Sequence, residues 1–327
     1  MNLPEICVII VNYGTADLAI SAAESVLDRS KDDRFVHIHI VDNASPGKDA
    51  HHLQVEHNRL GWEGKVTLHL EEKNLGFGRG NNCVLETYQM NNGRLPDKIF
   101  LLNPDAALYN NAIDALAGFL EQTPMAGFAG ARITKPDGTP ATAAFRFPNV
   151  VAEFSQTLNF GPIARLLDRW TVPLSPDLAR AHVDWVSGAA VMVRSEALMD
   201  VGLFDPGFFL YFEEVDLMHR ASEAGWETWY VPEAQVIHAE GVATGVKSDL
   251  QDRRRRPKYW YHSWQRYHRK RSGRAGAILA ACAYLSGLTG QYIIASVRRQ
   301  RINAPLQPFG DFWRYSVLPL LKQRQLP

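Results

Sequence analysis

The first 131 residues alternate short apolar runs with segments whose apolar side chains recur at helical spacing. Apolar runs bounded by turn-forming residues are typical of buried strands, and a spacing of three to four residues is typical of helices that cover a sheet. The alternation therefore predicts an α/β fold with a mostly parallel central sheet. The predicted strands are residues 6–11, 35–41, 66–70, 98–102 and 127–131, and the predicted helices are residues 15–27, 82–90 and 112–121.

Charge divides the chain into two regions. From Lys247 onward there are 17 Lys and Arg against 3 Asp and Glu, whereas the first 246 residues carry 18 against 32. Because 327 residues exceed what one core usually holds, we expect a domain boundary after Val246. The sequence thus predicts a first domain over residues 1–246, divided near residue 131. A basic, helical appendage over residues 247–327 would follow it.

Composition places this chain among soluble globular proteins, with 46% hydrophobic and 21% charged residues. Its cysteines, Cys7, Cys83 and Cys282, are odd in number and far apart, which argues against a disulfide framework and a zinc ribbon. The N-terminus lacks the basic and apolar regions of a signal peptide. We expect a cytoplasmic protein.

Polar side chains follow four of the predicted strands. Ligands of open α/β sheets bind outside the carboxyl ends of the strands, so these residues are candidates for a binding site. Ordinary turn chemistry is the alternative at each position, because Asn, Asp and Gly also dominate turns. The residues are Asn12 and Tyr13 after the first strand, Asp42, Asn43 and Ser45 after the second, Asn74 and Gly76 after the third, and Asn103 and Asp105 after the fourth.

The glycine-rich segment NLGFGRGNN, residues 74–82, does not fit a dinucleotide fingerprint. Its glycines alternate instead of following GxGxxG, and it comes after the third strand, not the first. The backbone amides of this segment, together with Arg79, could still approach phosphates or a sugar at the start of a helix.

An acidic cluster follows the aromatic run at residues 208–212. Glu213, Glu214 and Asp216 occupy the predicted first turn of a helix, where a carboxylate can face a bound substrate as a general base. The alternative is that these acids only stabilise the helix dipole.

Several segments occur in the order typical of family 2 glycosyltransferases. They are VIIVNYGTADL, VDNASPG, NLGFGRGNN, FLLNPDAAL, VSGAAVMVRSEAL, VGLFDPGFFLYFEEVDLMHR and VIH, which together span about residues 5–240. The chain resembles this family, and within it the rhamnosyltransferase-like branch of bacterial surface-polysaccharide enzymes. The resemblance implies a GT-A catalytic domain over residues 1–246, with a nucleotide-binding half over about residues 1–131 and an acceptor half over about residues 132–246. It also implies a nucleotide-diphosphate sugar donor, Mn2+ or Mg2+ as cofactor, and inversion at the anomeric carbon.

Carried onto this sequence, the resemblance implies a donor site. Asp42 would accept the imide N–H of uracil or thymine, so the donor would be a UDP- or dTDP-sugar. Asp105 would bind the metal at the second acid of the family's DXD motif, and His238 would complete the metal site. Asn103 replaces the first acid, which removes one charged ligand for a hard cation. The remaining donor-binding residues would be Asn12, Tyr13, Asn74, Gly76, Arg79 and Asn103.

The resemblance places the general base at Glu214. On a helix Glu213 and Asp216 share a face, and Asp216 can pair with Arg220, whereas Glu214 points away from both. Glu213 and Asp216 are the alternatives for the same role. Glu214 would remove the acceptor proton while the nucleoside diphosphate departs, without a covalent intermediate.

The acceptor is expected near Trp185, Ser187 and Gly188, because aromatic faces suit sugar rings. The same residue types also build buried strands, and this alternative is favoured for Phe208 and Phe212. The expected acceptor is a lipid-linked or polysaccharide glycan.

The basic tail predicts association with an anionic membrane surface through residues 253–301. Residues 275–297 carry no charge and could span a bilayer as a helix, but cations at both ends favour a helix that lies on the cytoplasmic leaflet. A buried helical hairpin is the alternative, and no nucleic-acid partner is expected. The aromatic residues expected at the membrane interface are Trp260, Tyr261, Trp264 and Tyr267.

These observations predict an inverting, metal-dependent glycosyltransferase that transfers a sugar such as rhamnose at the inner face of the plasma membrane. One alternative is a nucleotidyltransferase that makes the activated sugar, although VNYGTAD lacks the Lys or Arg that such an enzyme would need. The other is a non-catalytic glycan- or lipid-binding scaffold with the same fold.

Overall fold

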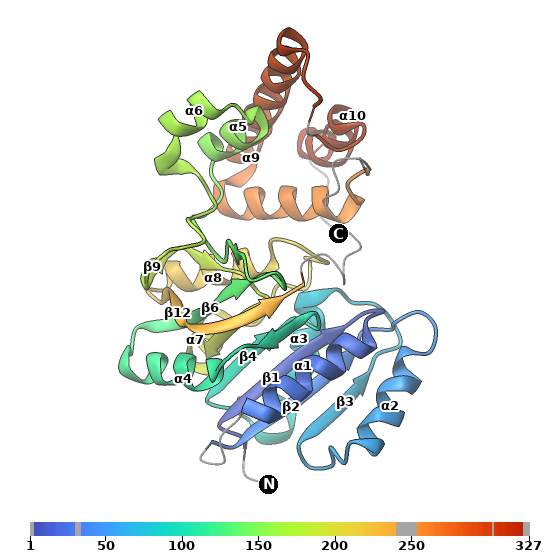
Figure 1. Ribbon diagram of the computed structural model, residues 1–327. Coiled ribbons are helices and arrows are strands. Elements are labelled where there is room, and N and C mark those ends of the chain that lie inside the picture. Colours follow the sequence, from blue (N-terminus) through green and yellow to red (C-terminus); the bar gives the residue numbers. More distant parts are fainter. Residues whose placement is uncertain (1–2, 30–33, 240–253, 303, 323–327) are drawn as a thin grey trace. The chain divides into compact units, whose positions relative to one another are not determined.

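The computed structural model describes residues 3–29, 34–239, 254–302 and 304–322. The chain forms two compact units (Figure 1). The first unit contains Met1–Phe145, Leu174–Asp205 and Glu214–Lys247, and the second contains Arg146–Pro173, Pro206–Glu213 and Ser248–Pro327.

The predicted boundary after Val246 lies outside the described residues. The sequence did not predict that residues 146–173 and 206–213 belong with the C-terminal helices. Charge patterning could not reveal this, because these two segments are joined to the tail by packing and not by composition.

The first unit is built on a mostly parallel central sheet, as predicted. The strand order is β3-β2-β1-β4-β11-β6-β12-β5, with β7 beside β6 and β9 beside β12. Strands β1 to β4 run parallel to one another, and β11 lies antiparallel between β4 and β6. The strands are β1 (Ile6–Asn12), β2 (Val36–Asp42), β3 (Val66–Leu70), β4 (Lys98–Leu102), β5 (Ala106–Leu108), β6 (Ala126–Thr134), β7 (Pro140–Ala141), β9 (Ala181–Val183), β11 (Ala190–Arg194) and β12 (Glu227–His238), while β8 (Ala144–Phe145) and β10 (Trp185–Val186) pair separately.

Helices cover both faces of this sheet: α1 and α2 lie on one face and α3 on the other (Figure 1). Buried side chains on β1 and β4 form the centre of the core. The sequence did not predict α2, because Leu53 is its only buried residue and the apolar periodicity is therefore weak. The helices are α1 (Ala16–Arg29), α2 (Asp49–Arg59), α3 (Phe77–Asn92), α4 (Ala112–Gln122), α7 (Ser195–Val201) and α8 (Glu213–Glu223).

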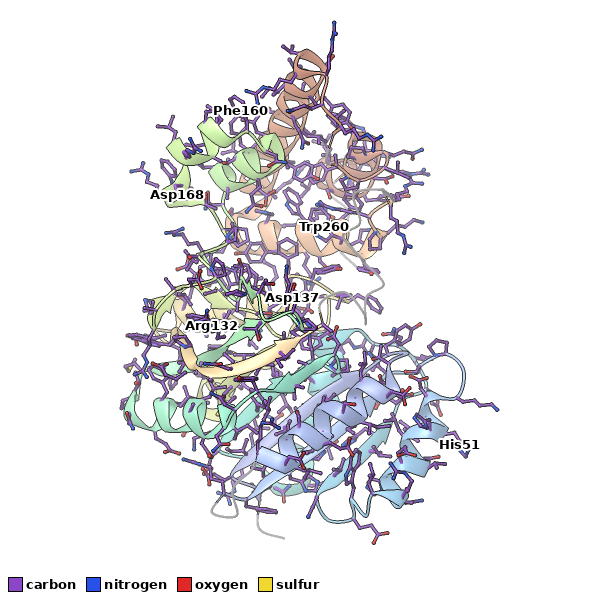
Figure 2. The ribbon with its side chains drawn as sticks, viewed as in Figure 1. His51, Arg132, Asp137, Phe160, Asp168 and Trp260 are labelled. Carbon is purple, nitrogen blue, oxygen red and sulfur yellow. The ribbon has the colours of Figure 1, made fainter. Side chains whose placement is uncertain are left out.

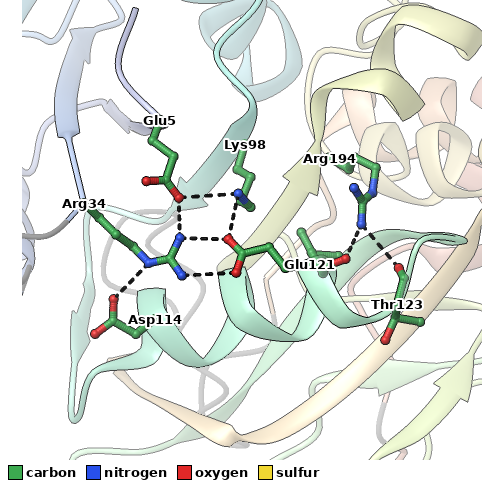
Figure 3. A network of polar contacts seen from close by, with 8 residues as sticks. Glu5, Arg34, Lys98, Asp114, Glu121, Thr123 and Arg194 are labelled. Carbon is green, nitrogen blue, oxygen red and sulfur yellow. Dashed lines mark hydrogen bonds and ion pairs between the residues drawn. The ribbon is translucent and has the colours of Figure 1, made fainter.

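An ion network closes the end of the sheet where the parallel strands begin (Figure 3). Arg34 contacts the carboxylates of Glu5, Asp114 and Glu121, and Lys98 Nζ lies 3.1 Å from Glu121 Oε1. Hydrogen bonding from Arg34 is the main reason that the pKa of Glu121 falls to about 2. The charges therefore join strands and α4 at the edge opposite the carboxyl ends of β1 to β4.

The second unit is helical. Its main element is α9 (Lys258–Arg298), which is interrupted at Gly273, where φ is +63°. Among the described residues, α9 is the one helix that is long and apolar enough to cross a membrane, judged by length and composition alone. The other helices are α5 (Val150–Leu158), α6 (Gly161–Leu166), α10 (Pro308–Phe312) and α11 (Leu318–Leu321).

The aromatic residues at the start of α9 form the core of this unit. Tyr261, Trp264 and Tyr267 are each 1% exposed, and Trp260 packs edge-on against Tyr261. The prediction of a membrane interface is therefore wrong for Tyr261, Trp264 and Tyr267, whereas Trp260 is half-buried and its place at an interface stays a prediction. A buried aromatic core and an interfacial aromatic belt use the same residue types, so the sequence could not separate them.

Candidate functional site

Asn12 organises the carboxyl ends of β1 and β2. Its amide nitrogen donates to Asp42 Oδ1 at 2.9 Å, and its amide oxygen accepts from the backbone and hydroxyl of Thr15. Ser45 N donates to Asp42 Oδ2 at 3.2 Å. Because Asn12 is fully buried and both ends of its amide are used, it orients Asp42, and its own contact with a donor stays a prediction.

A second network joins the ends of β2 and β3. Asn43 accepts from Leu75 N and donates to Asn74 Oδ1 and to the carbonyl of Gly76. Asn74 Oδ1 also accepts from Gly76 N at 2.9 Å. Gly76 precedes α3 with φ +83°, a conformation that favours glycine. The sequence placed Asn43 among the polar residues that follow the second strand, but assigned it no role in donor binding.

The other glycines of residues 74–82 serve packing. A Cβ on Gly80 would lie 2.8 Å from Val11 Cγ1, and a Cβ on Gly78 would lie 3.0 Å from Phe204 Cβ. These glycines let α3 approach the sheet closely. Arg79 and Tyr13 are exposed, so both side chains are available to a ligand.

Asp105 and His238 meet at the end of β4. His238 pairs with Ala106 where β12 runs beside β5, and its Nε2 lies 2.9 Å from Asp105 Oδ1. Asn103 Nδ2 lies 3.4 Å from the same nitrogen. Three residues that the resemblance assigned to the metal and donor site therefore lie together, although 133 positions separate Asp105 from His238.

The spacing of this pair fits two ligands of one divalent cation, with a carboxylate oxygen that suits Mg2+ or Mn2+ and an imidazole nitrogen that is a softer ligand. Two ligands of one octahedral ion bound at about 2.1 Å lie about 3 Å apart, close to the spacing of the Asp105 and His238 atoms. Among the described residues no group of three or more His, Cys, Asp and Glu side chains could hold a metal. The remaining ligands would come from diphosphate oxygens, water and the amide oxygen of Asn103, a pattern common for Mg2+.

Contacts around Gly188 link the Asp105–His238 pair to the acidic cluster that contains Glu214. Asn103 N donates to the carbonyl of Ala189 at 2.9 Å, where β11 begins beside the end of β4. A Cβ on the adjacent Gly188 would lie 3.6 Å from Phe77 Cε1 and 3.8 Å from Glu214 Cβ. Contacts thus run from Asn103 to Glu214 at one edge of the sheet. Phe77 was not predicted, because only the folded chain brings it to Gly188.

Glu214 has the environment of a general base. Its Oε2 atom is buried without a hydrogen-bond partner among the described residues. Burial is the main cause that raises the pKa of Glu214, and the N–H groups of Glu214 and Val215 oppose this effect. A carboxylate that has a raised pKa and an oxygen atom without a hydrogen-bond donor can take a proton from a hydroxyl group.

The backbone just before this acid adopts an uncommon conformation. Tyr211 and Phe212 have φ values of +70° and +68°, a region that large side chains rarely occupy. Within the second unit, Ser263 Oγ donates to the carbonyl of Leu210 at 3.0 Å and the ring of Phe212 lies 5.4 Å from that of Tyr267. Such strain persists only where packing enforces it, and it is common at functional sites.

The other two acids are more enclosed. Asp216 pairs with Arg220 at 3.0 Å, as expected from their spacing, and Arg220 also donates to the carbonyl of Leu203. Glu213 is 3% exposed. This arrangement favours Glu214 over Asp216 as the base, because Asp216 holds the segment that precedes the acidic cluster.

The predicted acceptor residues flank Gly188. Trp185 stacks on Phe145 with ring centroids 4.0 Å apart and an angle of 12°. Ser187 Oγ accepts from Ala189 N at 3.2 Å. Phe208 is fully buried, in line with the core alternative for that residue. The acceptor role of Trp185 and Ser187 remains a prediction.

Comparisons with known proteins point to one family. A family model described as glycosyl transferase family group 2 matches residues 99–321. An N-acetylglucosaminyl-diphospho-decaprenol L-rhamnosyltransferase of Mycobacterium tuberculosis H37Rv is 32% identical over 180 residues, which cover 53% of this chain and 58% of that protein. The rhamnosyltransferase WbbL of Escherichia coli K12 is 28% identical over 169 residues, which cover 50% and 60%. The matched region therefore spans about three-fifths of these relatives.

Solved structures share the fold. GalNAc-T7, crystallised with UDP, GalNAc and Mn2+, aligns over all of this chain and 59% of its own, with a TM-score of 0.57 and 16% identity. The mannosyltransferase PcManGT from Pyrobaculum calidifontis, in complex with GDP-Man and Mn2+, aligns over 99% and 89%, with a TM-score of 0.52 and 13% identity. These similarities confirm the predicted GT-A fold.

Proposed function

The chain belongs to glycosyl transferase family group 2, and from this premise we propose that it is an inverting glycosyltransferase that uses a nucleotide-diphosphate sugar. The observation that carries the proposal is the row of contacts joining the Asp105–His238 pair, through Asn103 and Gly188, to Glu214. A cation-binding pair and a base at one sheet edge are what transfer from a diphosphate donor requires. The family match gives no support to the nucleotidyltransferase alternative.

In the proposed reaction Glu214 takes the proton of an acceptor hydroxyl group. That oxygen forms a bond to the anomeric carbon as the bond from this carbon to the diphosphate oxygen breaks. Attack opposite the leaving group inverts the anomeric configuration, and the proton stays on Glu214 until water removes it. The position of Glu214 beside Gly188 sets where the acceptor hydroxyl group binds.

Asp105 and His238 would hold Mn2+ or Mg2+, which when bound neutralises charge on the diphosphate. Asn103 lies beside both and would contribute a neutral oxygen. Because Asn103 stands in place of an acid, Asp105 supplies the one carboxylate of this set. We therefore expect a weaker affinity for the cation than two carboxylates would give.

The donor nucleotide is proposed to be a pyrimidine, as UDP or dTDP. Asp42, held by Asn12 and Ser45, would accept the imide N–H of the base. Tyr13, which is 44% exposed, would stack on a ring of the donor, and Arg79 would approach its phosphates. Asn74 and Gly76 would shape the loop between them.

Both rhamnosyltransferases support rhamnose as the sugar, and the Mycobacterium tuberculosis relative supports a lipid-linked glycan as the acceptor. Trp185 and Ser187 would border the acceptor beside Gly188. An enzyme with a lipid-linked acceptor works at a membrane surface, so we place this one in the cytoplasm at the inner face of the plasma membrane.

A transfer assay tests the proposal. Purified protein is incubated with dTDP-rhamnose or a UDP-sugar and with N-acetylglucosaminyl-diphospho-polyprenol, with Mn2+ or with a chelator. We expect a glycosylated lipid with inverted anomeric configuration, formed only when the cation is present. Absence of both donor binding and transfer for every donor would contradict the proposal, and binding of donor without transfer would favour a scaffold.

A further inference from the structure

The half of α9 that follows Gly273 has one exposed face without any charge. The exposed residues recur every three to four positions, so they form a single stripe along the helix. Leu279, Ile293 and Val297 are 58%, 59% and 79% exposed, which is unusual for large apolar side chains that share one helix face. The stripe consists of Ala275, Leu279, Cys282, Ser286, Thr289, Ile293, Ser296 and Val297.

The opposite face of the same helix is packed within the second unit. A Cβ on Gly287 would lie 2.3 Å from the carbonyl oxygen of Phe154, so α5 approaches the backbone of α9 directly. Thr157 Oγ1 donates to the carbonyl of Tyr284 at 3.0 Å, and the ring of Tyr284 stacks on Phe312 at 3.9 Å. This half of α9 is therefore packed along one side and exposed to solvent along the stripe.

Cations lie at both ends of the stripe. Arg271 and Arg274 precede it, and Arg298, Arg299 and Arg301 follow it, all exposed. Arg298 also lies over the ring of Phe160, 4.8 Å from its centroid. Between the two groups of cations, about 34 Å of helix carries no charge.

We propose that this stripe is the surface through which the protein docks on an anionic lipid bilayer, with α9 lying in the plane of the leaflet. Apolar side chains would enter the boundary between headgroups and acyl chains, and the terminal arginines would meet anionic headgroups. A spanning helix is disfavoured, because α5 and α10 would have to enter the bilayer with it. A nucleic acid would require cations along the stripe and not only at its ends.

This inference goes beyond the proposed transfer, because it assigns a binding surface in the second unit. Docking is measured without donor or acceptor. Loss of transfer would therefore leave the docking result intact, and loss of docking would leave donor binding in solution intact.

Cosedimentation with vesicles tests the surface. We expect the full chain to bind phosphatidylcholine vesicles that contain phosphatidylglycerol, and to bind pure phosphatidylcholine vesicles much more weakly. Leu279→Asp with Ile293→Asp should lower the affinity by at least about tenfold, because two apolar anchors are lost. Met90→Asp, a matched change at a 77% exposed methionine on α3, should leave the affinity unchanged.

The arginines are tested separately. Arg301→Gln with Arg299→Asn should lower the affinity for anionic vesicles by about fivefold per cation removed and reduce its dependence on salt. Asn is chosen at position 299 because φ there is +52° and Asn tolerates this conformation. Equal binding by wild type and all stripe variants would overturn the proposal, as would binding to neither kind of vesicle.

Cys282 provides a native reporter of depth, because it is the exposed cysteine of the three and lies within the stripe. A fluorophore is attached to it in a Cys83→Ser background, and a second label is placed at Val297→Cys with Cys282→Ser. Lipids that carry quenchers at defined depths should quench both labels equally if α9 lies in the plane. Deep quenching at 282 and shallow quenching at 297 would show a spanning helix, and no quenching would show that the stripe stays in water. Either result would overturn the proposal.

Discussion

Glu214 combines two properties that a general base needs. It has a buried carboxylate oxygen without a partner among the described residues, and burial raises its pKa above the ordinary value of 4.5. Asp216, in contrast, is bound to Arg220. The proton acceptor of the proposed reaction is therefore distinguished by its surroundings and not only by its place in the sequence.

Glu214→Gln should lower kcat by about 10²–10⁴-fold while leaving donor affinity unchanged, because an amide cannot accept the proton. The matched control is Glu223→Gln at the exposed end of the same helix, which should keep full activity. Steady-state kinetics and calorimetric titration with nucleotide give the two readouts. In the wild type, the acidic limb of kcat/KM should lie above pH 4.5 because the pKa is raised. Full activity of the Gln variant would assign the base to another residue.

The buried imidazole of His39 makes the first unit sensitive to acid. His39 hydrogen-bonds to His69 at 2.8 Å and to Tyr88 at 2.9 Å, and burial lowers its pKa from 6.5 to about 2. Unfolded His39 takes up a proton near pH 6.5, whereas folded His39 does not. Its contribution to stability is therefore complete above about pH 6.5 and is lost as the pH falls below that value.

At pH 5.5 this effect should cost about 1.4 kcal/mol of unfolding free energy for His39 alone. His39→Gln should flatten the dependence of stability on pH between about 5 and 7, measured by urea denaturation. His51→Gln, at an exposed position on α2 (Figure 2), should leave the slope as it is. An unchanged slope in the His39 variant would mean that the folded imidazole titrates normally.

Single residues also show what a sequence can predict about a site. Asp105, His238 and Glu214 were predicted because each lies in a short motif that can be recognised from the sequence alone. Asn43 and Phe77 owe their places in the site to contacts with distant segments, so residue type and local sequence could not predict these contacts. The aromatic residues of α9 were assigned to a membrane because burial cannot be inferred from residue type where core and interface use the same side chains.

Among the secondary-structure elements, α3 depends most on close approach to the sheet. Gly80→Ala should destabilise the protein by about 1–3 kcal/mol, because its methyl group would meet Val11 Cγ1 at 2.8 Å. Gly118→Ala on α4 has open space around the new methyl group and should stabilise the protein by about 0.5–1 kcal/mol. Thermal or urea unfolding of the two variants measures this difference, and equal effects would show that α3 can shift away from β1.

The elements that were predicted correctly are those with the strongest periodicity. The strands at Val66–Leu70 and Lys98–Leu102 have the predicted bounds, because the first alternates apolar and polar residues, the second is apolar after Lys98, and polar residues follow both. α2 was missed because it buries one residue. The order of strands and the insertion of β11 between β4 and β6 depend on distant pairing, which local patterns do not encode.

For the whole molecule, the important fact is that the chain passes between the two units five times. Cutting the chain after Val246 would remove α9, on which α5 packs, while residues 146–173 would remain. We expect the fragment of residues 1–246 to expose apolar surface and to aggregate, although the charge pattern suggested it as a domain. Size-exclusion chromatography and binding of a hydrophobic dye would show this. A monomeric fragment with native donor affinity would contradict it.

The left-handed backbone at Tyr211 and Phe212 implies a trade-off between stability and catalytic rate. Conformations of this kind cost about 1–3 kcal/mol each, and Gly or Asn would relieve much of that cost. Selection for heat resistance should therefore accept Gly or Asn at these positions. Selection for catalytic rate should restore Tyr and Phe, because a more flexible backbone at these positions would hold Glu214 less precisely.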